Sequence, residues 1–196
     1  MPNVQESPDD EINLSHALTA IMGLIVRSSP SLTHIDVSRV LVCIGSNRQG
    51  KAGGIYGKLV PLKFENGSEV LKHRGTLYGI PEISHNNRSL LYIIYYYMPR
   101  FFDLSWLEKV RVMFHELYHI SPLFNGDIRR MGKVKKAHGH SKRHYDSLYK
   151  EELKSFLDHI RTSSHIDFLQ MDSKSLFNRY RQVTGIRMKK PRPVTV

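Results

Sequence analysis

The chain has 196 residues, 40% of them hydrophobic, and a formal net charge of +11. This length and composition are typical of one globular domain with a substantial core, and they exclude a wholly disordered or fibrous protein. A single cysteine, Cys43, excludes an intrachain disulfide framework and a zinc site of four cysteines, so we expect a cytoplasmic protein. We predict one domain over residues 11–185, with a disordered leader over 1–10 and a basic, flexible tail over 186–196.

The first part of the chain predicts a helix and then two strands. The helix is expected over Glu11–Ser28, and its apolar run Ala17–Val26 is too short to span a bilayer. The strands are expected over Val37–Ile44 and Ile55–Phe64, with a glycine-rich loop between them.

This loop nearly matches a phosphate-binding motif. Gly45, Gly50 and Lys51 have the spacing of G-x-x-x-x-G-K after an apolar strand. However, Ala52 stands where a Ser or Thr hydroxyl would hold magnesium. The glycines and proline of AGGIYGKLVP also disfavour the helix that should follow. A hairpin loop between two strands therefore explains the segment better than nucleotide hydrolysis.

The rest of the chain predicts three strands and then three helices. The strands are expected over 68–73, 75–80 and 89–98, and the last of them is dense in aromatic residues and isoleucine. The helices are expected over 106–120, 141–161 and 173–183. Ser105 and Glu108 have capping-box spacing at the start of the first helix, and Pro122 prevents much extension beyond its end.

The first of these helices carries the stretch FHELYH. His115 and His119 are four residues apart, so both imidazoles leave one helix face and can bind one zinc ion. Glu116 can act as the general base that activates a zinc-bound water. The preceding apolar strand is of the kind that aligns an extended peptide beside the metal helix of zinc peptidases. The pattern therefore predicts a zinc metallopeptidase that hydrolyses peptide bonds.

The motif and its surroundings also resemble a known family. HELYHISPLFNGDIRR and the later AHGHSKRHYD are similar to the putative phage metallopeptidase family of the zincin class, most clearly over residues 91–149. The resemblance implies an α+β, zincin-like fold, in which a small, mostly antiparallel sheet packs on the HExxH helix and further helices follow. It also implies His115 and His119 as zinc ligands, Glu116 as catalytic base, and a peptide or protein substrate.

A catalytic zinc site needs a third protein ligand, and the sequence leaves its identity open. Pro122 and Asn125 stand where the longer H-E-x-x-H-x-x-G-x-x-H motif has its glycine and third histidine. The ligand must therefore come from farther along the chain. His138 is the first candidate, which the family resemblance favours, and His140 is the second. The remaining alternatives are Asp127, Asp146 and no third ligand.

Three more residues are candidates for supporting roles. Asp127 or Asp146 could accept a proton from a ligand histidine and so fix its tautomer. Tyr145 could donate a hydrogen bond to the oxyanion that forms during hydrolysis. For each residue a purely structural role is the alternative.

Positive charge is concentrated in two clusters. Arg129–Arg143 contains seven Lys and Arg residues and no acidic residue, and Arg179–Arg192 contains six. Such clusters predict non-specific attraction to nucleic acid, or else only a solvated surface. The alternative function is therefore a basic, nucleic-acid-associated binding protein with a structural or degenerate zinc site, although the chain lacks a recognition motif.

Overall fold

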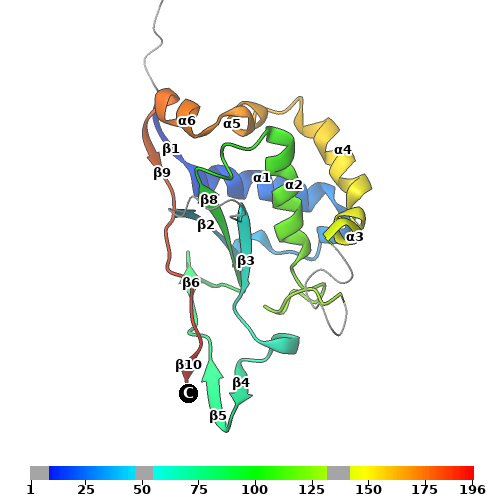
Figure 1. Ribbon diagram of the computed structural model, residues 1–196, viewed down its shortest axis with the longest axis vertical. Coiled ribbons are helices and arrows are strands. Elements are labelled where there is room, and N and C mark those ends of the chain that lie inside the picture. Colours follow the sequence, from blue (N-terminus) through cyan, green and yellow to red (C-terminus); the bar gives the residue numbers. More distant parts are fainter. Residues whose placement is uncertain (1–8, 47–54, 132–141) are drawn as a thin grey trace, which may run out of the picture.

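The computed structural model describes residues 9–46, 55–131 and 142–196, which form a mixed α+β fold with several small sheets (Figure 1). The strands are β1 (Asp9–Asn13), β2 (Val40–Ser46), β3 (Gly57–Pro61), β4 (Val70–His73), β5 (Thr76–Gly79), β6 (Ser84–His85), β7 (Arg88–Ser89), β8 (Tyr92–Met98), β9 (Tyr180–Thr184) and β10 (Val194–Thr195). The α-helices are α1 (Leu14–Ser28), α2 (Trp106–Tyr118), α3 (Lys142–Ser147), α4 (Lys150–Ile160), α5 (Ile166–Gln170) and α6 (Ser173–Arg179). Short 3-10 helices are η1 (Pro30–Leu32), η2 (Val37–Arg39) and η3 (Glu65–Gly67).

The sheet beside α2 is mixed, whereas we expected it to be mostly antiparallel. Its strand order is β2-β8-β3, with β2 parallel and β3 antiparallel to β8. Residues 47–54 of the glycine-rich loop lie outside the described residues, but the flanking strands show that it is no hairpin loop, because β8 lies between them. The sequence could not reveal this order, since β8 joins the sheet only after several intervening strands.

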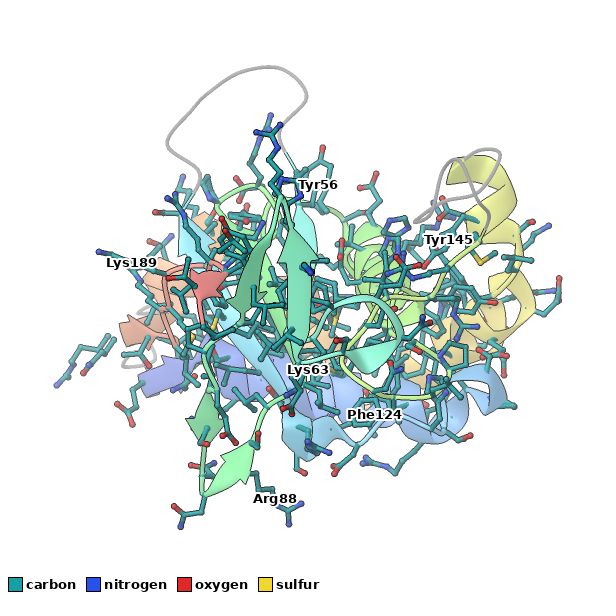
Figure 2. All side chains as sticks on the ribbon, turned by 90° about the horizontal axis from the view of Figure 1, so that it is seen from below. Tyr56, Lys63, Arg88, Phe124, Tyr145 and Lys189 are labelled. Carbon is teal, nitrogen blue, oxygen red and sulfur yellow. The ribbon has the colours of Figure 1, made fainter. Side chains whose placement is uncertain are left out.

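Side chains that alternate along these strands bury both faces of the sheet. On one face Val42 and Ile94 belong to the larger core, which α1 and α2 cover. On the other face Cys43 and Ile93 form a smaller core, against which Ile186 of the C-terminal segment packs. Figure 2 shows α2 and this C-terminal segment on opposite sides of the sheet. Cys43 is therefore a buried core thiol, as predicted.

Helix α2 forms as its sequence predicts. The Ser105 hydroxyl accepts a hydrogen bond from the Glu108 backbone N–H, while the Glu108 carboxylate accepts one from the Ser105 N–H, so the capping box is confirmed. Val110, Phe114 and Leu117 are fully buried on the face that packs into the core. Burial of this apolar face leaves the opposite side of α2 available to form a cleft.

The helices after the site differ from the prediction. The helix expected over 141–161 is broken into α3 and α4 at Leu148 and Tyr149, where Leu148 donates to the Tyr145 carbonyl and the Tyr149 ring stacks on Phe114. The helix expected over 173–183 is only half helical, because after α6 the chain continues as β9 and pairs in parallel with β1. Local periodicity cannot report a strand partner so distant in the sequence.

Both ends of the described chain take part in strand pairing. Asp9, in the expected leader, begins β1, whereas residues 1–8 lie outside the described residues. Within the expected tail, β10 pairs with β5 and completes the sheet β10-β5-β4, which projects from the rest of the fold (Figure 1). Among the described residues, no helix is long and apolar enough to cross a membrane.

Candidate active site

A cleft of about 1180 Å³ is lined by helix α2, by strand β3 and by residues of α3 and α4. His115, Glu116 and His119 all line it from the α2 side, because positions one and four residues apart can share one side of a helix. His115 is partly exposed, whereas Glu116 and His119 are 7% and 8% exposed. The HExxH residues predicted from the sequence are therefore brought together at one cavity.

The two imidazoles face each other through their Nε2 atoms, which lie 3.1 Å apart. Two imidazole nitrogens bound to one tetrahedral zinc ion at about 2.0–2.1 Å would lie roughly 3.3 Å apart. The observed separation is close to this value, and the ring planes are almost perpendicular at 88°. The pair therefore fits two nitrogen ligands of a single metal ion.

The far nitrogen of His115 contacts a carboxylate. Its Nδ1 lies 3.1 Å from Oδ1 of Asp146, which also accepts a hydrogen bond of 2.7 Å from the Tyr149 hydroxyl. Burial, followed by the bond to Asp146, raises the pKa of Tyr149, so this hydroxyl remains a donor. Donation from Nδ1–H to Asp146 leaves the Nε2 lone pair of a neutral His115 available to a metal. The contact predicted for Asp146 is present, whereas Tyr149 was not predicted.

Glu116 is held by the backbone of β3. Its Oε2 accepts a hydrogen bond of 2.7 Å from the Leu59 N–H. A Cβ atom at Gly57 would lie 3.0 Å from Cγ of Glu116 and 3.1 Å from its Oε1, so glycine permits this close approach. Sequence reasoning missed both positions, because neither a backbone donor nor the lack of a side chain belongs to a motif.

Tyr145 packs beneath the histidines. Its side chain is fully buried, and its ring stacks on His119 with centroids 4.8 Å apart and an interplanar angle of 25°. Burial raises the pKa of Tyr145 well above its ordinary value. The ring does not line the cleft, so its described surroundings favour support of His119 over contact with a substrate.

Asp127 has the structural role that was the alternative for it, because its carboxylate bonds to the loop after α2. Its carboxylate accepts hydrogen bonds from the backbone N–H groups of Asn66 and Ile128 and from the guanidinium of Arg130. The Asn-Gly-Asp turn brings several nearby donors to this buried carboxylate, whereas Asp146, the other candidate, makes the contact with a histidine.

The preferred third ligands, His138 and His140, lie outside the described residues. Within the described part of the chain, no group of three His, Cys, Asp or Glu residues is arranged to hold a metal ion. The chain on either side of residues 132–141 nevertheless contacts His119: the Arg129 N–H donates to its carbonyl at 2.7 Å, and the Tyr145 ring stacks on its imidazole.

Comparison with protein families supports the motif. The family described as putative phage metallopeptidase matches residues 11–165, so the chain belongs to this family. The match extends far beyond the region over which the resemblance is clearest in the sequence. Comparisons with curated proteins and with solved structures gave no match.

Proposed function

We propose that this protein is a zinc-dependent metallopeptidase with a zincin-like active site in the cleft between α2 and β3. The observation that carries the proposal is the pair of Nε2 atoms of His115 and His119, 3.1 Å apart beside the buried carboxylate of Glu116. His115 and His119 are the proposed metal ligands, with His138 as the third and His140 as its alternative. A bound zinc ion would supply a Lewis acid that polarises the peptide carbonyl and makes water more acidic.

Glu116 carries out the proton transfers, and Asp146 keeps His115 in one tautomer. Leu59 holds Oε2 of Glu116 through its N–H, and the positioned carboxylate takes a proton from the attacking water. The water oxygen bonds to the peptide carbon, and the carbon–nitrogen bond then breaks. Glu116 passes its proton to the leaving amine, while Asp146 holds the Nδ1 proton of His115 throughout.

Strand β3 is suited to aligning the peptide, whereas the apolar strand that we expected in this role is not. That strand, β8, is central in its sheet, so both of its edges are paired. In the described part of the chain β3 is an edge strand. The Tyr97 N–H donates to the Tyr56 carbonyl, and the Leu62 N–H donates to the Leu91 carbonyl. Because backbone groups alternate in direction along a strand, the even-numbered residues of β3 bond to β8 and the odd-numbered residues face the other way. The backbone groups of Gly57 and Leu59 therefore point away from β8, toward the cleft.

Metal analysis and a peptidase assay test the proposal together. The purified protein should contain about one zinc ion per chain, and His115→Ala or His119→Ala should lose it, because each removes one proposed ligand. Glu116→Gln should retain zinc but lose at least about a hundredfold in kcat/KM on a cleaved peptide, the scale of a general base.

Glu151→Gln, an exposed acid on α4, is the matched control and should leave both quantities unchanged. Zinc retained in both histidine variants would contradict the metal assignment. Full activity in Glu116→Gln would contradict the role of the base.

A further inference from the structure

Three cationic residues of the described chain border the cleft. Lys58, Arg111 and Lys150 all border the cavity, and none forms an ion pair with a carboxylate among the described residues. In such a position a cation is available to a ligand.

The carboxylates of the same cleft are engaged. Glu108 is bonded to Ser105 in the capping box, Asp146 contacts His115, and Glu116 accepts from the β3 backbone. Among the described residues, three cations and three carboxylates therefore border the cavity, so an excess of positive charge arises only from the further cations beside Lys58.

The cations are most concentrated at Lys58. Its side chain contacts that of Lys190, and Arg192 lies close enough to act on the same ammonium group. Burial first, and then these neighbouring charges, lower the pKa of Lys190. Bringing like charges together is unfavourable unless an anion joins them. Strand β3 and the C-terminal segment, far apart in sequence, thus bring three cations close together.

The position of Lys58 in β3 identifies where that group would lie on a bound peptide. Lys58 stands between Gly57 and Leu59, whose backbone groups face the cleft. An extended peptide paired with this edge would place the side chain opposite Lys58 on the same face of the sheet, within about 4.5–5.5 Å between Cβ atoms. Val60, two residues on, belongs to the smaller core, so this face is the one that the C-terminal segment crosses (Figure 2).

We propose that the cleft selects peptides with an Asp or Glu side chain opposite Lys58, where Lys58, Lys190 and Arg192 bind its carboxylate. This inference rests on the proposed peptidase function, since it assigns a substrate class to the same site.

Matched peptides test this selectivity. Internally quenched peptides that differ only by Glu, Gln or Lys at each position around the cleaved bond should give kcat/KM for the zinc-loaded protein. At one position Glu should exceed Gln by about fivefold, the upper range for an exposed charge pair. Because added salt shortens the screening length from about 10 Å at about 0.1 M to about 3 Å at about 1 M, this ratio should fall toward one.

Variants at the cations provide the decisive comparison. Lys58→Met should bring the Glu-to-Gln ratio close to one, and Lys58→Glu should reverse the preference toward Lys. Lys190→Met should lower the ratio to a smaller extent. Lys72→Met, which removes an exposed cation on the projecting sheet, should leave the ratio unchanged.

The outcomes separate this inference from the proposed function. Cleavage without a preference for Glu, or a preference that survives in Lys58→Glu, overturns the inference and leaves the peptidase standing. Failure to cleave any peptide with zinc bound overturns both. If Lys58→Met with Lys190→Met abolishes binding of a single-stranded oligonucleotide but leaves the peptide ratio unchanged, the cations serve nucleic acid and the inference is wrong.

Discussion

Two walls of the cleft, helix α2 and strand β3, supply different kinds of chemical group. Helix α2 presents side chains, namely two imidazoles and a carboxylate, whereas β3 presents backbone at Gly57 and a backbone N–H at Leu59. A substitution on α2 can therefore remove a reacting group and leave the fold intact. At Gly57 and Leu59 of β3 a substitution can act on Glu116 only through position, because the backbone donor of Leu59 remains whatever side chain the strand carries.

The largest effect is expected for the proposed third ligand, which would bind the same metal ion as the two histidines of the helix wall. His138→Ala should weaken zinc affinity by a large factor, because His138 is the ligand that we propose to join His115 and His119. Its neighbours, Ala137 and Gly139, are small and allow close approach of the backbone. Zinc affinity can be measured by competition with a chromophoric chelator.

His140→Ala and His144→Ala are the comparisons for this measurement. His144→Ala should leave zinc affinity close to that of the unaltered protein. A large loss in His140→Ala without one in His138→Ala would move the ligand by two residues.

A smaller effect is expected for Asp146 of α3, which also lines the cleft and contacts His115. Asp146→Ala should lower zinc affinity by about ten- to a hundredfold, because His115 loses the acceptor that fixes its Nδ1 proton. Tyr149→Phe, which removes only the hydroxyl bonded to Asp146, should cost less. Asp158→Ala, an exposed acid on α4, serves as control, and an effect equal to that of Asp146→Ala would assign the loss to general charge.

The helix wall could be predicted because its signals are local. The capping box at Ser105 and Glu108, the apolar spacing and the HExxH motif all lie within fifteen residues of one another. Each rests on helical geometry that repeats every 3.6 residues. The predicted end of α2, near Ile120, was correspondingly correct within two residues.

The strand wall could not be predicted because its groups act over long sequence separations. Leu59 bonds to Glu116 across a separation of 57 residues. In the sequence, Gly57 indicates only that the helix of a phosphate-binding loop is disfavoured there. The edge position of β3 follows from its pairing with β8, which no local pattern in either strand specifies. The same limit explains the missed strand β9, whose partner β1 lies at the other end of the chain.

Gly57→Ala sharpens the contrast between the walls, because it changes no reacting group. The new methyl carbon would lie 3.0 Å from Cγ of Glu116 and equally close to Cγ1 of Val112, so the Glu116 carboxylate must shift. A displacement of a catalytic group by a fraction of an ångström should lower kcat/KM by about tenfold, while the zinc content stays unchanged because no ligand is touched.

The matched control for this change is Gly79→Ala on β5. Its methyl carbon would meet mainly the side chain of Val196, far from the cleft, so activity should be unaffected. Comparable losses of activity in both variants would mean that glycine replacement merely destabilises a strand. Unaltered activity in Gly57→Ala would show that Glu116 does not depend on β3 for its position. A loss confined to Gly57→Ala, with zinc retained, would establish that the strand wall contributes to catalysis by placing a side chain of the helix wall.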